Sequence, residues 1–410
     1  MKLSYDRHLA ALVLLAFVGR FWGAMAADYF LGDEVVHVPA AVHFVKEGRF
    51  IYHWVHPPMN HLLTYGGMLL FGDNPYGWRM LYVLFGSLSV GILVAVGKRL
   101  FSDKRAAYLA GALMAVEPLN IIMSRTNFME IATIFFFLCG VYGTLRYLED
   151  RRRSLFWVGI VFGLTMAEKW YFLLPLLTLA AYTVFSLRAK ASALWQEGIY
   201  LAFSFFIVPA IVYLAAFTPW FRMGHDVEEF FQLQIDMYRQ LQAFRIDNYL
   251  GSFVRFMPST SPWNWFVMPL ISASPINASD KYAKFMIIMN NFPVWFFAIP
   301  ACLWSIYTII RERNKPLLLM LMLFLVSYGQ FAVVNRPLFL YTATAVLPFL
   351  YLLISFFIVD IMRRITPSPL PYRLVIFLVI AWGIYLYPFI TGRVVPVELY
   401  TPLLKLVKPL

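Results

Sequence analysis

Cysteine is nearly absent from this sequence, and charged residues are scarce. Only two cysteines occur among the 410 residues, Cys139 and Cys302, and both lie in apolar runs. Two such cysteines cannot form a disulfide framework or a zinc site, so we interpret them as buried small hydrophobic residues. Charged residues make up only 14% of the chain, whereas soluble domains have about a quarter. These absences exclude a disulfide-stabilised secreted domain and an ordinary soluble enzyme.

The sequence also has no internal repeat, no low-complexity segment and no evident cleavable signal. Its first apolar stretch is long and has no small-residue cleavage site, so we expect a retained membrane anchor. Internal repeats are typical of secondary transporters. Their absence disfavours that class.

Apolar residues dominate instead, at 61% of the chain with a mean hydropathy of +0.68. This composition predicts an all-α polytopic membrane protein. Runs of apolar residues indicate about eleven transmembrane helices. We place them near residues 8-30, 79-98, 106-123, 129-148, 154-167, 169-186, 199-217, 293-311, 316-334, 338-360 and 372-392.

Basic residues gather in alternate loops, after the second, fourth, sixth, eighth and tenth predicted spans. Basic loops stay in the cytoplasm, so we expect a cytoplasmic N-terminus and an extracytoplasmic C-terminus. The formal net charge of +12 is then a signal of topology. We infer no nucleic-acid binding from it.

Two long segments, 28-78 and 218-292, fall outside on this topology, and they divide the chain into three parts. We expect an N-terminal membrane module over 1-217 that includes the first outer loop, a second outer loop over 218-292, and a C-terminal four-helix module over 293-410. The apolar stretch 61-71 is too short to span and suits a re-entrant or interfacial helix. The polar run 226-248 and nearby tryptophans suit another interfacial helix.

An acidic pair, Asp33 and Glu34, follows the first predicted span. Charge at a membrane border is costly and usually marks function. The stiff turn His56-Pro57-Pro58 lies in the same loop. We therefore predict that this loop holds a reaction centre at the membrane surface.

Further charged residues lie at the predicted outer ends of other spans: Glu117, Arg125, Glu130, Lys169 and Arg336. This constellation suits group transfer from a lipid-anchored phosphate. A carboxylate can act as general base on an acceptor hydroxyl. Arginine and lysine can neutralise the departing phosphate.

Each of these features also has a purely structural interpretation. The acidic pair could be a solvated helix end, and His56-Pro57-Pro58 a rigid turn. Arg125 and Arg336 could anchor to lipid headgroups, while Glu117, Glu130 and Lys169 could form structural ion pairs. The spacing of His37 and His43 is no standard ligand pattern, so we predict no metal site.

The order of these motifs resembles the protein O-mannosyltransferases, which use dolichyl-phosphate mannose. Asp33-Glu34, His56-Pro57-Pro58, Ser124-Arg125 and Lys169-Trp170 carry the resemblance in the N-terminal half. Later motifs extend it over nearly the whole chain: Thr218-Pro219-Trp220-Phe221, Ser261-Pro262-Trp263-Asn264-Trp265, Asn291-Phe292-Pro293-Val294-Trp295 and Arg336-Pro337-Leu338-Phe339-Leu340-Tyr341.

The resemblance implies a C-type glycosyltransferase (GT-C) fold with two large extracytoplasmic loops, and inverting transfer of a sugar to a serine or threonine hydroxyl. It implies that Asp33 is the catalytic carboxylate, with its acidic neighbour Glu34 as a second predicted catalytic residue. The implied donor-phosphate residues are Arg125, Lys169 and Arg336, and the further site candidates are His56, Glu117, Glu130 and Tyr341. No cofactor is expected.

The sequence departs from the family pattern at three points. Thr342 stands where a histidine is common, and Glu117 stands where many members have an aspartate. The second outer loop is too short for the large insert of the eukaryotic members, which indicates a compact prokaryotic member in a prokaryotic cell membrane.

Two function classes stay open at this point. The first is transfer of a sugar, with mannose favoured, from a polyprenyl or dolichyl phosphate to a protein, or alternatively to a lipid or glycan. The second is a polar-lipid transporter or flippase. The expected partners are the lipid-linked donor, a protein acceptor and the bilayer, and a dimer is compatible with the sequence.

Overall fold

The computed structural model describes residues 6–49, 54–151, 154–187, 191–243, 261–266, 271–278, 282–334, 338–365, 368–396 and 398–399. Contacts divide the chain into two compact units. Unit 1 comprises Met1–Gly23, Leu100–Met123 and Phe244–Leu410, and unit 2 comprises Ala24–Arg99 and Ser124–Ala243. These units differ from the three consecutive modules that we predicted, because the first and third predicted spans group with the C-terminal half.

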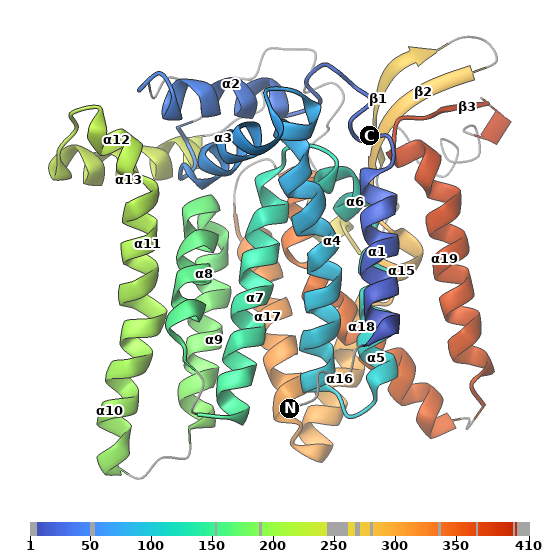
Figure 1. The fold of residues 1–410 in the computed structure, drawn as a ribbon. Coiled ribbons are helices and arrows are strands. Elements are labelled where there is room, and N and C mark those ends of the chain that lie inside the picture. The colour runs from blue at the N-terminus through green and yellow to red at the C-terminus, as the bar shows by residue number, and fades with distance from the viewer. Residues whose placement is uncertain are drawn as a thin grey trace. The chain divides into compact units, whose positions relative to one another are not determined.

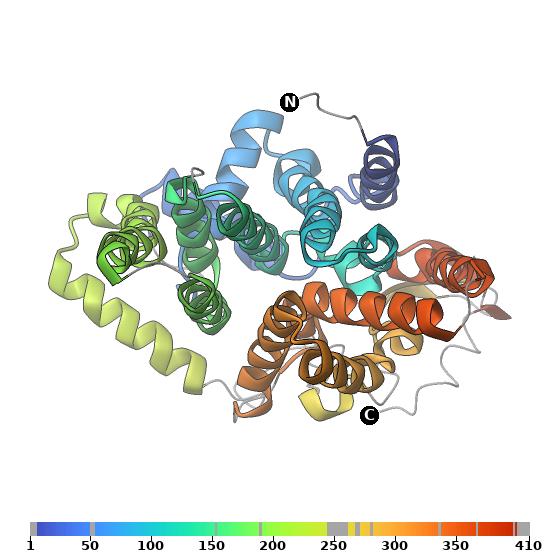
Figure 2. The ribbon, with the colours of Figure 1, turned by 90° about the horizontal axis from the view of Figure 1, so that it is seen from below.

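Unit 2 is helical in all its described secondary structure (Figure 1). Its upright helices are α4, α7, α8, α9, α10 and α11, and the helices α2 and α3 lie across the ends of α4, α7 and α8 (Figures 1 and 2). The bounds are α2 Glu34–Val45, α3 Met59–Phe71, α4 Pro75–Leu100, α7 Met129–Glu149, α8 Phe156–Glu168, α9 Leu173–Ser186, α10 Ala191–Ala202, α11 Val208–Ala216, α12 Thr218–Arg222 and α13 Val227–Ala243.

Glycines let two helices of unit 2 approach closely. An added Cβ at Gly159 would lie 2.8 Å from Val208 Cβ, and one at Gly163 would lie 2.5 Å from Val212 Cβ. Small residues at helix interfaces allow backbones to come together in membranes. Gly159 and Gly163 therefore place α8 against α11.

Unit 1 combines helices with a small sheet. The helices are α1 Arg7–Phe21, α5 Lys104–Ala115, α6 Pro118–Ser124, α15 Phe292–Trp295, α16 Ala298–Glu312, α17 Lys315–Ala332, α18 Leu347–Ile365 and α19 Leu370–Ile390. The strands β1 Ile271–Ala278, β2 Tyr282–Met289 and β3 Val394–Pro396 form an antiparallel sheet in the order β1-β2-β3. The all-α prediction therefore needs correction, because part of the second predicted outer loop pairs its backbone as a hairpin.

A buried arginine fastens α1 within unit 1. Arg20 is 0% exposed, and its guanidinium donates to Asn120 Oδ1 at 2.5 Å and to the carbonyl of Met114 at 3.0 Å. Its length allows one charged side chain to satisfy acceptors on both α5 and α6. These two helices are bent by 57° relative to each other at Glu117-Pro118, because proline lacks an N–H and interrupts a helix.

A described helix occupies part of each of the eleven predicted spans. Six helical segments of the described chain are long and apolar enough to cross a membrane, or seven if the bent pair α5–α6 counts as one span. The first predicted span, 8-30, is too long, because α1 ends at Phe21. The protein is therefore an integral membrane protein, and the count of eleven and the two outer loops stay predictions.

Candidate active site

An ion pair between Glu34 and Arg79 lies at the centre of the polar residues of unit 2. Both side chains are 0% exposed, and the guanidinium donates to both carboxylate oxygens, with Nε–Oε1 2.8 Å and Nη2–Oε2 2.7 Å. Backbone N–H groups of Leu31 and Asn127 donate to the same carboxylate, at 2.8 and 3.2 Å. Four donors thus occupy Glu34, which favours a positioning role over the predicted catalytic one.

Arg79 also holds the chain that leads into the acidic pair. Its remaining N–H groups donate to the carbonyls of Ala24, Ala27 and Tyr29, at 2.7 to 2.9 Å. A guanidinium presents five donors in a rigid fork. The planar side chain therefore sets the path of residues 24–29 and fixes where α2 begins.

Arg79 was not among the predicted site residues. Arg79 follows Trp78 at the start of the second predicted span, so it is also a cation at a span end. This position at a span end could have identified Arg79 as a candidate. Nothing in the sequence indicated that its partner is Glu34, 45 residues earlier.

A chain of hydrogen bonds continues from this ion pair. Asn127 Nδ2 donates to Thr64 Oγ1 at 2.6 Å, and Thr64 Oγ1 lies 3.0 Å from the Tyr82 hydroxyl, which donates to Asn60 Oδ1 at 2.5 Å. All four side chains are buried. Buried hydrogen-bond networks restrict the motion of the segments that they join. The network joins α3, α4 and the turn before α7.

Asp33 differs from its neighbour Glu34. It immediately precedes α2, it is half-buried, and its side chain makes no capping hydrogen bond to the helix. Burial raises the pKa of the Asp33 carboxyl, His37 and Lys169 act in the opposite direction, and Glu130 adds to the increase. A carboxylate with a raised pKa that is not committed to a helix cap is suited to accept a proton.

Lys169 and Glu130 form the second ion pair of this region. The ammonium of Lys169 donates to Glu130 Oε1, and the two residues are 8% and 1% exposed. Lys169 also lies over the ring of Tyr171, with 5.6 Å between Nζ and the ring centre. The pair places one positive charge within electrostatic range of Asp33.

Two histidines of unit 2 are buried close to these acids. His37 Nδ1 donates to the carbonyl of Asn127 at 2.8 Å, which ties α2 to the turn before α7. Burial, with a contribution from the charge of His37, lowers the pKa of His61 to about 3. His61 is therefore neutral at physiological pH.

Unit 2 thus contains six of the predicted site residues. Arg125 is 6% exposed between α6 and α7, and His56 is half-buried in the turn before α3. The other four are Asp33, Glu34, Glu130 and Lys169. Of the three predicted cations, Arg125 and Lys169 belong to this unit, and Arg336 falls outside the described residues.

Glu117 and Tyr341 belong to unit 1. The Glu117 carboxylate accepts from the Tyr351 hydroxyl, from Trp295 Nε1 at 3.4 Å and from the Leu119 N–H at 3.2 Å. Trp295 belongs to one of the family-like motifs. Glu117 is therefore a buried side chain that connects α6, α15 and α18. Tyr341 lies in the 3₁₀ helix Leu340–Ala345 before α18.

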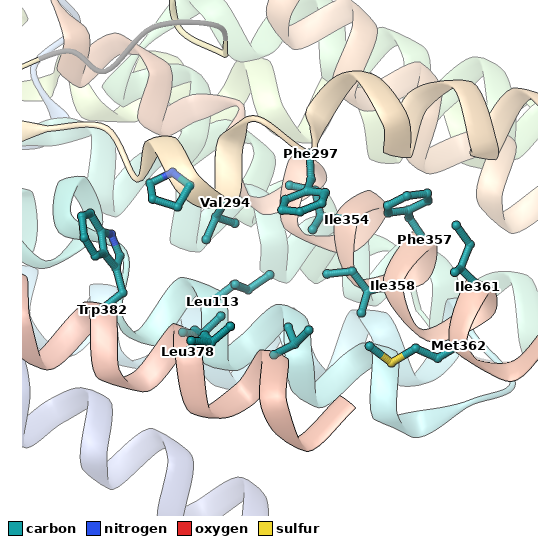
Figure 3. A pocket seen from close by; sticks show the side chains of 13 residues that line it. Leu113, Val294, Phe297, Ile354, Phe357, Ile358, Ile361, Met362, Leu378 and Trp382 are labelled. Carbon is teal, nitrogen blue, oxygen red and sulfur yellow. The ribbon is translucent and has the colours of Figure 1, made fainter. Parts of the chain in front are cut away.

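Unit 1 also contains an apolar cavity with a volume of about 440 Å³ (Figure 3). Val294 and Phe297 line one side and face Leu113 and Leu378 on the other. Further lining residues come from α18 and α19, including Ile354, Phe357, Ile358 and Trp382. A cavity with this lining can hold hydrocarbon but supplies no group for acid–base chemistry.

Unit 2 contains groups that are suited to proton transfer beside a buried positive charge. Asp33 can take a proton, and Lys169 and Arg125 are buried positive groups in the same unit. Within the described ranges, no group of three histidine, cysteine, aspartate or glutamate side chains is arranged to hold a metal ion.

Comparison with known proteins identifies relatives of the chain. A family model described as dolichyl-phosphate-mannose-protein mannosyltransferase matches residues 55–216. The polyprenol-phosphate-mannose–protein mannosyltransferase of Corynebacterium glutamicum is 22% identical over 84% of this chain and 81% of its own length. The protein of the same name from Mycolicibacterium smegmatis is 24% identical over 82% of this chain and 78% of its own.

A solved structure shares the fold. The crystal structure of ArnT from Cupriavidus metallidurans bound to undecaprenyl phosphate matches with a TM-score of 0.57 and 17% identity. The match covers 93% of this chain and 64% of the solved chain, so the chain spans less than two thirds of that protein. The fold is that of the GT-C glycosyltransferases, and the resemblance to the protein O-mannosyltransferases is confirmed, as is the enzyme class, glycosyltransferase.

Proposed function

We propose that this relative of the polyprenol-phosphate-mannose–protein mannosyltransferases moves mannose from a polyprenyl phosphate to a serine or threonine hydroxyl of a protein. The single observation that carries the mechanism is the contrast between the two adjacent acids. Glu34 is held by four donors, whereas Asp33 makes no helix-capping bond beside the Lys169–Glu130 pair. One acid positions the backbone, and the other is available to the substrate.

In the proposed reaction the acceptor hydroxyl oxygen attacks the anomeric carbon of mannose. Asp33 takes the hydroxyl proton as the new carbon–oxygen bond forms. The bond between the anomeric carbon and the phosphate oxygen breaks on the opposite face, so the configuration inverts and polyprenyl phosphate leaves as an anion. Arg125 and Lys169 stabilise the negative charge that grows on that phosphate.

The predicted orientation belongs to this proposal. The site faces the extracytoplasmic side, the N-terminus lies in the cytoplasm and the C-terminus outside, because the basic loops then all face inward. A prokaryotic cell membrane is the proposed location. Substituted-cysteine labelling tests the orientation: access of an outside reagent to residue 150 would contradict it, and access to residue 236 would support it.

Substitution of Asp33 by asparagine tests the function. The change keeps the size of the side chain and removes the basic oxygen, so we expect transfer from labelled polyprenyl-phosphate mannose to fall about 10²- to 10⁴-fold, with donor binding retained. Asp28→Asn is the matched control, because Asp28 is an exposed aspartate of the same segment. An Asp33→Asn enzyme within threefold of the parent would contradict the role of base.

The acceptor is identified in the same assay. Transfer to a serine- or threonine-containing peptide supports protein O-mannosylation. Transfer to a lipid or glycan with no transfer to peptide would replace the proposed acceptor and leave the donor chemistry in place. Donor binding with no transfer to any acceptor would contradict the enzyme reaction and favour lipid transport.

Arg125 is tested through the donor phosphate. Arg125→Ala should weaken binding of polyprenyl phosphate, and Arg125→Lys should restore it only in part, because an ammonium keeps the charge and loses the planar fork. Unchanged affinity of Arg125→Ala with a lower melting temperature would instead indicate a structural arginine.

A further inference from the structure

Glu168 is a buried acid that the proposed reaction does not use. It is the last residue of α8, it is 0% exposed, and neither carboxylate oxygen has a hydrogen-bond partner among the described residues. The C-terminus of a helix is its negative end and does not favour an anion. A buried carboxylate without donors is costly, so protein contacts in the described ranges give Glu168 no structural role.

The groups around Glu168 leave it without a donor. Glu168 interacts electrostatically with Lys169 and Glu130, but the ammonium of Lys169 donates to Glu130 Oε1. The other oxygen of that neighbour, Glu130 Oε2, is also buried and has no partner in the described parts of the chain. Tyr82 interacts electrostatically with Glu168 as well, and its hydroxyl proton goes to Asn60 Oδ1.

The buried atoms that lack partners in this cluster are mostly acceptors. They are both oxygens of Glu168, Glu130 Oε2 and Asn127 Oδ1, against one donor group, Asn60 Nδ2, counted over the described residues of the cluster. A ligand that satisfies them must bring several hydrogen-bond donors. Sugar hydroxyls are such donors, and each also offers an oxygen lone pair to the amide of Asn60.

The cluster also borders the proposed base. Asp33 interacts electrostatically with Glu130 and Lys169, the same two residues that interact with Glu168. Asp33 and Glu168 therefore have the same two charged neighbours. The transferred sugar must lie against Asp33 when its anomeric carbon is attacked.

We propose that Glu168, together with Glu130 Oε2, binds hydroxyl groups of the transferred sugar and makes the site selective for that sugar. This inference rests on the proposed function, and it assigns Glu168 a binding role with no bond made or broken. It predicts that Glu168 distinguishes the sugar-bearing donor from bare polyprenyl phosphate.

The test compares Glu168→Gln with the parent enzyme on donors that differ only in the sugar. Glu149→Gln is the matched control, because Glu149 ends α7, is partly exposed and pairs with Arg99. Burial raises the pKa of the Glu168 carboxyl, so we expect Glu168→Gln to lower kcat/KM for polyprenyl-phosphate mannose about three- to tenfold, as for loss of a hydrogen bond between uncharged groups. Affinity for bare polyprenyl phosphate should stay within twofold.

Donors that each lack one hydroxyl of the mannose identify the hydroxyl that Glu168 binds. For the donor that lacks the hydroxyl bound by Glu168, parent and Glu168→Gln should react equally fast, while the other deoxy donors keep the loss. An equal loss of affinity for the bare phosphate, or the same loss with every deoxy donor, would overturn the inference. If Glu168→Gln does not fold, Glu168→Asp is used in its place.

The design separates this inference from the function on which it rests. If the parent enzyme transfers no mannose, the proposed function fails, and binding of sugar-bearing and bare polyprenyl phosphate still tests Glu168. If the parent transfers mannose and Glu168→Gln treats all donors alike, only the inference about Glu168 fails.

Discussion

Glu117 of unit 1 and Glu168 of unit 2 are both glutamates with no exposed surface, at positions where a helix ends or bends. Glu117 accepts hydrogen bonds from Tyr351, Trp295 and the backbone of Leu119. Glu168 accepts none from the described residues. Burial of a carboxylate therefore does not by itself indicate a structural role or a functional one, and the difference lies in the donors that surround it.

The same difference separates the adjacent acids of unit 2. Glu34 is occupied by Arg79 and two backbone N–H groups, whereas the Asp33 side chain does not cap α2. Neighbouring acids of similar chemistry thus have different roles, because the backbone at the start of α2 points them at different partners.

The largest effect should come from breaking the buried ion pair between Glu34 and Arg79 in unit 2. Arg79→Ala removes the paired charge and two of the four donors of the buried Glu34 carboxylate, and it leaves three carbonyls without the guanidinium, which should lower the free energy of unfolding by about 3–5 kcal/mol. Thermal denaturation in detergent measures the change. Arg79→Lys should recover part of it, since an ammonium keeps the charge without the bidentate geometry.

Arg105→Ala is the control for this experiment. The Arg105 side chain is 47% exposed and pairs with Asp103, and exposed pairs contribute about 0–1 kcal/mol. Equal losses from Arg79→Ala and Arg105→Ala would show that burial of the Glu34–Arg79 pair has no energetic consequence.

Acid should weaken unit 2 through His61. Its folded-state pKa of about 3 lies below that of an unfolded histidine, about 6.5. The unfolded state binds the proton first, so this contribution to stability is complete above pH 6.5 and is lost as the pH falls toward 3. At pH 5 the loss should reach about 2 kcal/mol.

His61→Asn isolates this contribution from that of Asp33. The raised pKa of Asp33 acts with the opposite sign, because the folded state then binds a proton more readily than the unfolded one. Parent and His61→Asn keep the same Asp33, so the difference between their melting curves at pH 7.5 and pH 5 reports on His61. A pH-independent difference would contradict the buried neutral state of this histidine.

Substitution by glutamine should separate the two buried glutamates directly. Glu117→Gln places an amide N–H₂ against either the Trp295 indole N–H or the Leu119 N–H, so that a donor meets a donor. We expect a loss of about 1–3 kcal/mol in the free energy of unfolding. Glu168→Gln disturbs no such bond among the described residues, and its stability should stay within about 0.5 kcal/mol of the parent. Equal losses in the free energy of unfolding for Glu117→Gln and Glu168→Gln would contradict this difference between the two glutamates.

Hydropathy predicted much of the membrane architecture from the sequence. A described helix lies at each predicted span, because an apolar segment in lipid must satisfy its backbone hydrogen bonds internally. The short apolar stretch 61-71 lies in α3, which lies across the ends of other helices of unit 2 (Figure 1), and its re-entrant or interfacial placement stays a prediction. The all-α prediction was wrong for the small sheet. There β2 pairs with β3, which follows it by more than a hundred residues in the sequence, and hydropathy does not report such distant pairing.

The candidate site could be predicted only in outline. Asp33, Arg125, Glu130 and Lys169 were found because charge is rare in this chain and expensive near a membrane. Glu34 was grouped with Asp33 for the same reason. Its separate role depends on Arg79, and no local pattern connects two residues in different segments of the chain.

The sequence by itself determined that this chain enters a membrane and has the motif order of the protein O-mannosyltransferases, because hydropathy and motif order are properties of consecutive residues. Only the tertiary structure decided which acid is occupied and which is available. That outcome depends on which donors reach each carboxylate: Arg79 reaches Glu34, Tyr351 reaches Glu117, and no described side chain donates to Glu168. Hydrogen bonds act over about 3 Å between heavy atoms, so folding, which brings distant segments together, assigns the roles.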